Sequence, residues 1–353
     1  MERVMLGRTG MEVVRLGCGG IPIIGVEFKE AVKVVRAAYE AGLNFFDNAR
    51  AYDNSERKMG TALKDVRDKV FLATKVWPRD ARSALKDLET SLKELQTDHL
   101  DLWQLHDVST RGDLEKVLGK GGALEAVRKA QKRGKVRFVG ISSHNYDNLL
   151  RIIDCGEFDT VMFTYNLGSR EVEHEVLPRA AQTAIGTLCM KPVSGGVFFS
   201  LSQEEEGKKG KVTPRDALRF VLGERRIQVV LSGFKRVSDV KENVETFKRF
   251  KPLTDEERAR LLAFGDSLGE GFCRNCTYCL PCPNGMPIPT ILQILDHAQR
   301  FSYEWPTHRR TYAALEIKAD VCDQCGQCEE ACPFDVKIIA RLAKAHQQFS
   351  KPF

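Results

Sequence analysis

The sequence of 353 residues contains no run of about 18 apolar residues, the length that would indicate a transmembrane helix. Its first six residues carry no apolar segment of the kind found in a secretory signal. The net charge is only +6, and the basic residues form no dense stripe with interleaved aromatic residues. We therefore predict no membrane span and no nucleic-acid partner, and the modest positive charge suits a phosphate-rich cofactor.

A Gly-x-Gly-x-x-Gly run after the first apolar segment is also missing, which disfavours an open, doubly wound nucleotide-binding sheet. Instead, short apolar segments alternate with amphipathic helical stretches. The expected strands are residues 14–18, 45–47, 70–75, 100–106, 136–141, 160–165, 186–190 and 228–232. The expected helices between them are residues 29–41, 81–95, 123–133, 146–153, 171–181, 214–222 and 238–250. This alternation predicts a (β/α)8 TIM barrel.

The chain is longer than a barrel of roughly 250 residues requires. We place the barrel in residues 1–268 and a small second domain in residues 269–353. Residues 5–14 read as a hairpin that turns at residues 8–10 and plugs one end of the barrel. A further helix is expected to begin near Thr254, because Thr254 and Glu257 have the spacing of a capping box.

The eleven cysteines are distributed unevenly. Eight of them follow residue 268 in two runs that are each closed by proline: Cys273, Cys276, Cys279 and Cys282, then Cys322, Cys325, Cys328 and Cys332. The second run has the spacing of bacterial ferredoxins, in which the last cysteine ligates the other cluster. Helical patterns at residues 290–300 and 312–319 predict a small, helical, ferredoxin-like domain with two 4Fe-4S clusters.

By the crossing rule, one cluster has three ligands in the first run and its fourth in the second run, and the other cluster has the reverse. The expected sets are Cys273, Cys276 and Cys279 with Cys332, and Cys322, Cys325 and Cys328 with Cys282. Cys282 follows its neighbour at a shorter spacing than Cys332 does, so a single cluster remains an alternative. Zinc is the other alternative, although its four ligands usually come as two pairs with a longer gap between them.

Four polar residues lie at or after the ends of expected strands: Asp47, Tyr52, Lys75 and His106. Each has an ordinary structural explanation by itself, such as a helix cap, a surface cation or a core histidine. The carboxyl ends of barrel strands converge on one mouth, however, so these side chains are expected to meet. Together they provide what carbonyl reduction requires, because an acid must neutralise the oxygen when hydride reaches the carbon. A cation beside tyrosine would ease loss of its proton.

Several short motifs resemble the aldo-keto reductases: residues 46–52 (Phe-Asp-Asn-Ala-Arg-Ala-Tyr), 73–75 (Ala-Thr-Lys), 105–107 (Leu-His-Asp) and 140–145 (Gly-Ile-Ser-Ser-His-Asn). The resemblance covers roughly residues 3–250. It implies a (β/α)8 barrel, a nicotinamide cofactor and a catalytic tetrad in which Tyr52 is the general acid and Asp47, Lys75 and His106 assist. It also implies cofactor contacts at the following residues: Ser142, Ser143, Asn166, Gly233, Lys235, Arg236, Glu242 and Asn243.

Lys235 and Arg236 are expected to hold a 2′-phosphate, which favours NADP(H) over NAD(H). A solvated helix start is the structural alternative for this pair. The chain also departs from the family: Met190 stands where many members stack an aromatic ring on the nicotinamide, and Met162 stands where many offer glutamine. Ser143 replaces a frequent asparagine. These departures predict looser cofactor binding.

The Met-Lys-Pro stretch at residues 190–192 is similar to a branch of the family that carries a C-terminal ferredoxin-like tail. The three remaining cysteines, Cys18, Cys155 and Cys189, are interpreted as small buried apolar residues with no catalytic role.

Three functions are consistent with these observations. The first is an NADP(H)-dependent oxidoreductase that reduces a small carbonyl or quinone-type molecule while its clusters relay electrons, with a redox partner protein as a further acceptor or donor. The second is a carbonyl reductase whose clusters are structural. The third is a sensor of NADP(H) and oxygen, against which the intact tetrad argues. The missing signals and oxygen-sensitive clusters predict a cytoplasmic protein.

Overall fold

The computed structural model of the chain describes residues 1–193, 212–267, 273, 279–300, 305–332 and 336–350. Contacts divide the chain into two compact units. The first contains Met1–Ser194 and Thr213–Thr254, and the residues from Asp255 onward belong to the second. Helix α11 (Asp255–Ser267), which the sequence prediction assigned to the first domain, is thus grouped with the second unit. The exact domain boundary stays a prediction.

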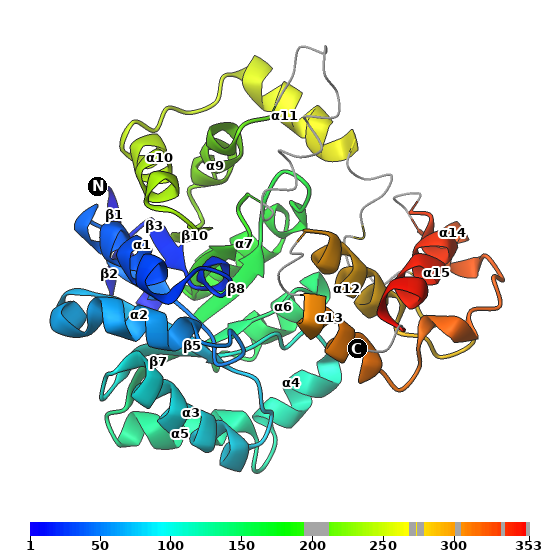
Figure 1. Cartoon of the computed structure of the whole chain (residues 1–353), viewed down its shortest axis with the longest axis horizontal. Coiled ribbons are helices and arrows are strands. Elements are labelled where there is room, and N and C mark those ends of the chain that lie inside the picture. The colour runs from blue at the N-terminus through cyan, green and yellow to red at the C-terminus, as the bar shows by residue number, and fades with distance from the viewer. Residues whose placement is uncertain (194–211, 268–272, 274–278, 301–304, 333–335, 351–353) are drawn as a thin grey trace. The chain divides into compact units, whose positions relative to one another are not determined.

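Eight parallel strands form a closed barrel in the first unit, in the order β10-β3-β4-β5-β6-β7-β8-β9 (Figure 1). The strands are β3 (Leu16–Gly19), β4 (Phe45–Asp47), β5 (Phe71–Val76), β6 (Leu100–Leu105), β7 (Val136–Ser142), β8 (Thr160–Thr164), β9 (Gly186–Met190) and β10 (Val229–Gly233). β10 pairs with both β9 and β3, and this double pairing closes the sheet. The predicted barrel is confirmed, and each strand lies within about two residues of its expected position.

The helices of this unit follow the strands in turn. They are α1 (Phe28–Glu40), α2 (Ser55–Leu63), α3 (Ala81–Leu95), α4 (Arg111–Leu118), α5 (Ala123–Lys132), α6 (Tyr146–Asp154), α7 (Val176–Thr183), α9 (Pro214–Gly223) and α10 (Val237–Lys248). α3 shows how the sequence encodes them: the side chain of Asp80 caps its first turn by accepting from Ser83 N–H at 2.8 Å. Its buried face consists of Ala84, Leu88 and Leu92 with two neighbours.

Helices α2 and α4 were missing from the sequence prediction, for different reasons. In α2 the buried residues include the charged Glu56 and Lys58, so no apolar periodicity marks the helix. In α4 only Leu114 and Val117 are buried, which is too few to produce a clear pattern in eight residues. In the fold, α2 packs against α1 and α3, and α4 packs against α5.

The predicted N-terminal hairpin is confirmed. β1 (Arg3–Met5) pairs with β2 (Glu12–Val14) in antiparallel fashion, and Gly10 closes the turn with φ +71°. Leu6, Met11 and Val13 are buried together with barrel residues such as Leu102 and Leu188. Gly7 N–H donates to the side chain of Gln228, which directly precedes β10, at 3.0 Å. The hairpin therefore seals the end of the barrel at which the strands begin.

All regular secondary structure in the described residues of the second unit is helical. Besides α11 it contains α12 (Ile288–Arg300), α13 (Trp305–Ala313), α14 (Gln327–Glu330) and α15 (Ile338–Phe349). α12 confirms the first predicted helix. The second, at residues 312–319, is wrong, because α13 ends at Ala313 and a short 3-10 turn, Ala319–Val321, follows. Ile291, Leu295 and Leu342 form part of one apolar core, against which six of the eight cysteines in the two runs pack.

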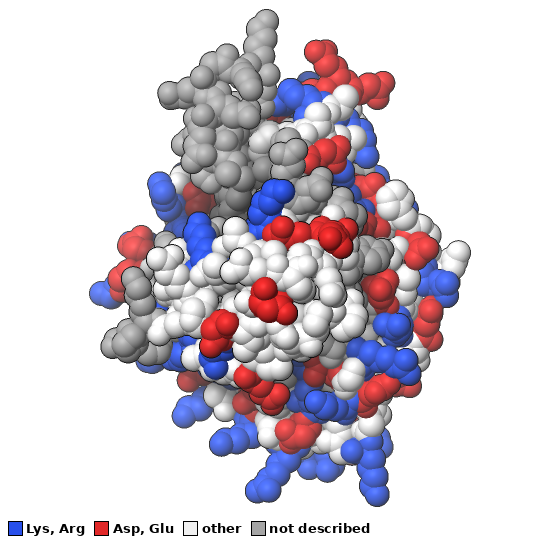
Figure 2. Space-filling model, turned by 90° about the vertical axis from the view of Figure 1, so that its right-hand side faces the viewer, with Lys and Arg blue, Asp and Glu red and all other residues white. Residues whose placement is uncertain are grey.

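Charged residues on the face drawn in Figure 2 are interspersed by sign, with lysines and arginines next to aspartates and glutamates over much of it. The central part of that face carries few charged side chains. Within the described ranges, no helix combines the length and the apolar character needed to cross a lipid bilayer.

Candidate active site and cysteine-lined cavity

Three of the four predicted tetrad residues are positioned by neighbouring strands. Asp47 is the last residue of β4, Lys75 lies in β5, and His106 follows β6 directly. Register pairs Asp47 with Ala73 and Lys75 with Gln104, so that the strand ends stand side by side. The parallel topology brings residues 28 and 31 positions apart in sequence to one end of the barrel, as the sequence predicted.

Asp47 and Lys75 form a buried ion pair. Lys75 Nζ lies 2.5 Å from Asp47 Oδ2 and also donates to the carbonyl of Asn48 at 2.7 Å. The two side chains are only 6% and 2% exposed. Burial raises the pKa of the Asp47 carboxyl and lowers the pKa of the Lys75 ammonium, and their mutual attraction opposes both shifts. Lys75 therefore holds its proton less tightly than an exposed lysine.

Tyr52 lies in the turn after β4, close to this pair. Lys75 Nζ is 5.2 Å from the centroid of the Tyr52 ring. Backbone bonds fix the turn, because Tyr52 N–H donates to Ala49 at 3.0 Å and Ser55 N–H donates to the Tyr52 carbonyl at 2.9 Å. The ring is half-buried. The tyrosine thus stands beside a desolvated cation, as the proton donor of a carbonyl reductase requires.

His106 lies between two aromatic rings, with centroids 5.7 Å from Tyr52 and 5.0 Å from Trp77 in edge-on geometry. Burial, followed by the positive charge of Lys75, holds the pKa of His106 well below its ordinary value. The imidazole is therefore neutral at physiological pH. Its Nδ1 atom is buried and has no hydrogen-bond partner among the described residues. A neutral imidazole has one N–H to offer a substrate oxygen.

Sequence reasoning missed two residues that contact this group, Gln104 and Trp77. Gln104 Nε2 donates to Asp47 Oδ1 at 2.8 Å from a fully buried position in β6. A signal was present in the sequence: Gln104 lies two positions before His106 in a strand whose other residues, apart from Asp101, are apolar. Gln104 and His106 therefore share one face of the strand. Trp77, two positions after Lys75, also reaches the site without having been predicted.

The predicted nicotinamide contacts lie at the same end of the barrel. Ser142 and Ser143 follow one another at the end of β7, and both are buried. Ser142 Oγ accepts from Asp107 N–H at 2.8 Å, while Asn166, just after β8, donates to the carbonyl of Lys191 at 3.0 Å. Their hydroxyl and amide groups also organise the surrounding loops. Contact with a carboxamide stays a prediction.

Both predicted methionine departures face the barrel interior. Met162, in β8, is buried in the cluster that the hairpin completes, and the half-buried Met190 at the end of β9 packs against it. Neither position offers a hydrogen-bonding group or an aromatic ring. The prediction of looser cofactor binding rests on this difference.

The expected adenosine-phosphate region lies at the end of β10 and the start of α10. Lys235 and Arg236 are exposed, and the backbone N–H groups of both donate to Asp239 Oδ2 at 2.9 Å. Asn243 Oδ1 accepts from Ser232 Oγ at 3.0 Å. Lys235 and Arg236 thus lie directly before the first turn of α10, and the exposed Glu242 lies further along the same helix.

Gly233 has a packing requirement of its own. A Cβ at this position would lie 2.3 Å from Pro22 Cγ. The loop after β3 therefore lies directly on the last residue of β10, and only glycine permits this close approach.

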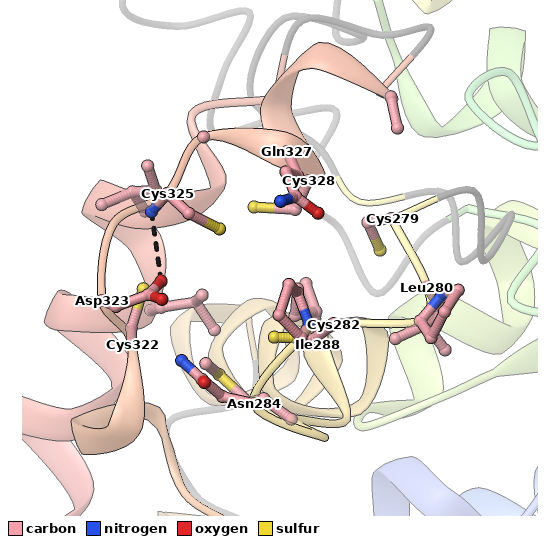
Figure 3. A pocket seen from close by; sticks show the side chains of 17 residues that line it. Cys279, Leu280, Cys282, Asn284, Ile288, Cys322, Asp323, Cys325, Gln327 and Cys328 are labelled. Atoms are coloured by element: carbon pink, nitrogen blue, oxygen red, sulfur yellow. Dashed lines mark hydrogen bonds between the residues drawn. The ribbon is translucent and has the colours of Figure 1, made fainter.

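In the second unit, five cysteines line one cavity of about 200 Å³: Cys279, Cys282, Cys322, Cys325 and Cys328 (Figure 3). The Cys325 and Cys328 sulfurs point toward one another across it. Among the described residues no three His, Cys, Asp or Glu side chains converge closely enough for a single metal ion. The thiols instead surround a space that fits a multi-atom cluster held by thiolates.

The lining of this cavity brings together one of the two predicted ligand sets. Cys322, Cys325 and Cys328 share it with Cys282 from the other run. Of the other set, Cys273 and Cys332 are half-buried and pack against the same apolar core, and Cys279 reaches the cavity edge. Cys276 lies outside the described residues. Ligation by these cysteines stays a prediction.

The burial predicted for the three isolated cysteines is confirmed for two of them, and the absence of a catalytic role stays a prediction. Cys18 and Cys189 are buried in barrel strands and Cys155 is half-buried. Burial, assisted by the Asp47 carboxylate, raises the pKa of Cys18 to about 12, and burial also raises the pKa of Cys189. These groups are therefore neutral thiols with little nucleophilic character.

Comparison with known proteins identifies both parts of the chain. The sequence model of the aldo/keto reductase family matches residues 15–217, and that of a 4Fe-4S dicluster domain matches residues 272–337. The chain therefore belongs to the aldo-keto reductase family and is an NAD(P)H-dependent oxidoreductase of this class. It carries a C-terminal 4Fe-4S dicluster domain in addition to the barrel, as the sequence predicted.

Individual relatives agree with this assignment. The chain is similar to the aldo-keto reductase YhdN of Bacillus subtilis, with 32% identity over 58% of this chain and 66% of that protein. It is 28% identical to L-galactose dehydrogenase of Arabidopsis thaliana, over 72% of this chain and 90% of the relative.

Among solved structures, an aldo-keto reductase from Bacillus halodurans in its holo form has a TM-score of 0.65 at 24% identity, over 75% of this chain and 96% of the other. One from Klebsiella pneumoniae in complex with NADPH has a TM-score of 0.60 at 23% identity, over 74% of this chain and 94% of the other. These two likenesses establish the barrel fold.

Proposed function

We propose that the protein is an NADP(H)-dependent oxidoreductase that reduces a carbonyl or quinone-type substrate by hydride transfer, and that iron–sulfur clusters in its C-terminal domain relay electrons. One observation carries the first part: a buried Asp47–Lys75 pair stands against Tyr52, with a neutral His106 beside the same ring. This arrangement concentrates a proton donor, a cation and an N–H donor where a carbonyl oxygen would become negative.

Each residue has a distinct task in the reduction. Bound NADPH supplies the hydride to the carbonyl carbon. The Tyr52 hydroxyl gives its proton to the oxygen, so that aldehyde or ketone becomes alcohol. Lys75 stabilises the negative charge left on the tyrosine, and Asp47 keeps the ammonium in place. His106 orients the carbonyl oxygen through its single N–H, which a protonated imidazole would do less selectively.

Cofactor selectivity is assigned to the start of α10. Lys235 and Arg236 are exposed at the helix N-terminus, where backbone N–H groups and basic side chains both favour a phosphate. The relative from Klebsiella pneumoniae, described in complex with NADPH, supports the same preference. Ser142, Ser143 and Asn166 are proposed to hold the nicotinamide end, with Met190 beside the ring.

Two 4Fe-4S clusters are proposed for the second unit. The cavity lined by Cys282, Cys322, Cys325 and Cys328 would hold one of them. Cys273, Cys276, Cys279 and Cys332 would hold the other. A nicotinamide transfers two electrons as hydride and a cluster normally carries one, so a substrate with a stable one-electron state, such as a quinone, suits the combination. A redox partner protein is a further candidate acceptor, and we place the protein in the cytoplasm.

A carbonyl reductase with structural clusters is the second candidate. Cysteines of both runs pack against the apolar core of the small unit, so metal binding would contribute to its folding free energy. Under this alternative the clusters stabilise the fold of the domain and transfer no electrons. A sensor function is disfavoured, because sensing requires no proton donor at Tyr52.

Tyr52→Phe tests the proposal. The substitution removes the hydroxyl and keeps the ring that contacts His106 and Lys75. With anaerobic protein, NADPH oxidation by 9,10-phenanthrenequinone should fall about 10²–10⁴-fold, while NADPH binding and iron content stay unchanged. Undiminished hydride transfer would refute the assigned chemistry.

Cluster reduction is followed by electron paramagnetic resonance in the same samples. Signals that appear with NADPH and the quinone in the native protein, and not in Tyr52→Phe, support the relay. Signals that appear only with dithionite favour structural clusters.

A further inference from the structure

We propose that Gln104 is a positioning residue for the reaction: its amide fixes Asp47, and through Asp47 it holds Lys75 against Tyr52. The inference rests on the function proposed above and adds a fifth residue to the predicted tetrad. Gln104 contacts none of the reacting atoms.

The geometry singles out this side chain. Asp47 has two oxygens: Oδ2 lies 2.5 Å from Lys75 Nζ, and Oδ1 accepts from Gln104 Nε2 at 2.8 Å. Gln104 lies next to Lys75 in the β5–β6 register, so its amide reaches past the lysine to the carboxylate. The carboxylate is therefore held from both sides, by a charged donor and a neutral one. Rotation about its last bond would break both contacts.

Burial of the Gln104 amide is unfavourable in free energy, because one of its polar atoms has no partner. The residue is fully buried, and its Oε1 atom has no hydrogen-bond partner among the described residues. A buried carbonyl without a partner is unfavourable, because it has given up its hydrogen bonds to water without replacing them. Within the described part of the chain, the hydrogen bond from Nε2 to Asp47 is the one that the side chain makes. The reverse orientation of the amide would set two oxygens against each other.

The barrel wall makes room for the side chain. A Cβ at Gly140, which pairs with Gln104 across β6 and β7, would lie 2.8 Å from Gln104 Cγ and 2.5 Å from Thr160 Oγ1. Thr160 Oγ1 is also buried without a partner in the described structure. Two oxygens thus remain unpaired around one glycine. In this layer of the barrel, the Gln104 amide keeps its hydrogen bond to Asp47 while Gln104 Oε1 and Thr160 Oγ1 have no partners among the described residues.

Few other groups act on Asp47. Cys18 in β3 faces it as a neutral thiol, and Lys75 in β5 is its ionic partner. Lys75 in turn is influenced by Glu56 in α2, and its charge acts on His106 after β6. Gln104 is thus the only uncharged donor to the carboxylate among these groups. Its hydrogen bond favours the ionised form of Asp47.

Gln104→Met removes the amide at nearly constant volume. Without the donor, the pKa of Asp47, already raised by burial, rises further. Activity is present above this pKa and is lost as the pH falls through it, so the acid limb of the kcat profile moves to higher pH. From the usual strength of a hydrogen bond to a charged group, we expect the acid limb to move by about one pH unit. At a given pH on that limb, kcat should then be about tenfold lower.

Gln104→Glu is the second variant. A protonated carboxyl at this position can donate to Asp47, whereas an ionised one repels it. Activity relative to Gln104→Met should therefore recover as the pH falls, which is opposite to the trend expected from damage to the fold. This variant keeps the inference testable if Gln104→Met folds poorly.

The matched control is Gln228→Met. Gln228 directly precedes β10, at the end of the barrel opposite to Gln104. Its Oε1 accepts from the N–H groups of Gly7 and Thr187 at 3.0 and 3.1 Å. This variant should lower the melting temperature and leave the pH profile unchanged.

The measurement is the pH dependence of kcat and of kcat/KM for 9,10-phenanthrenequinone with NADPH, on the anaerobic holoprotein. A shifted acid limb in Gln104→Met, with acid recovery in Gln104→Glu, supports the inference. Unshifted profiles in both variants overturn it, provided that Tyr52→Phe is inactive. An active Tyr52→Phe refutes the proposed function itself, whatever the Gln104 variants show.

Discussion

The barrel site and the cysteine-lined cavity are built on opposite principles. At the barrel mouth, Asp47, Lys75 and His106 come from three different strands, and the protein itself neutralises the buried charges. In the cavity, successive ligand candidates are separated by two or three intervening residues within each run, and their thiols line an open space. The first site is complete when the chain folds. Under the proposed ligation, the second site is complete only when a cluster is bound, because thiolates gathered without metal repel one another.

The difference extends to what surrounds each site. The barrel mouth is supported by the paired strands and by a hairpin that fills the far end. The small unit has one apolar core of helices, against which cysteines of both runs pack. We expect the barrel to tolerate loss of metal and the small unit to depend on it.

The largest effect should follow from breaking the buried pair with Lys75→Met. Asp47 would be left as a buried, unpaired carboxylate, so the free energy of unfolding should fall by about 3–5 kcal/mol. Carbonyl reduction should fall by about 10²–10⁴-fold. Denaturant unfolding and steady-state kinetics measure the two effects.

Lys58→Met is the control that separates the loss of stability from the loss of activity. Lys58 is also buried, and its Nζ donates to three backbone carbonyls in the loop after β3 at 2.8–2.9 Å. The Lys58→Met variant should be less stable than the native protein, with a much smaller loss of kcat than Lys75→Met. Equal losses of kcat in both variants would contradict the special role of the Lys75 contact.

The next effect concerns the cavity. Cys282→Ala removes the one lining cysteine that is proposed to cross between the runs. With two clusters present, iron content should fall by roughly half, and the small unit should become more susceptible to proteolysis. Metal analysis of anaerobically purified protein and limited proteolysis provide the test.

Cys155→Ala is the matched control, because Cys155 is a half-buried cysteine of the barrel unit. Its iron content should equal that of the native protein. Full iron content in Cys282→Ala would show that the cavity is ligated differently.

The smallest effect is expected where charges are exposed. Lys235→Ala combined with Arg236→Ala should reduce the preference for NADPH over NADH by about tenfold or more, since a phosphate dianion would lose two cationic partners. The stability of the barrel should change little, because both side chains are solvated. Lys241→Ala, an exposed lysine further along α10, controls for general charge effects. An unchanged ratio of kcat/KM for the two cofactors would favour the solvated helix start.

The sequence alone determined the barrel, its strand positions, the tetrad candidates and the cysteine runs. These features are encoded locally: strands by short apolar segments, catalytic candidates by polar residues at strand ends, and cluster ligands by fixed spacing. The hairpin was likewise predictable from its turn residues. Helix α2 was not, because its buried face contains Glu56 and Lys58, whose partners lie elsewhere in the chain.

Tertiary structure decided which residues meet. Pairing of β5 with β6 placed Gln104 beside Lys75 and gave Asp47 a second donor, a contact between residues 57 positions apart. Folding of the small unit placed Cys282 among Cys322, Cys325 and Cys328, as spacing had suggested without fixing it. Burial then lowered the pKa values of Lys75 and His106. Desolvation and side-chain partners depend on the whole fold, and for that reason no local pattern reveals them.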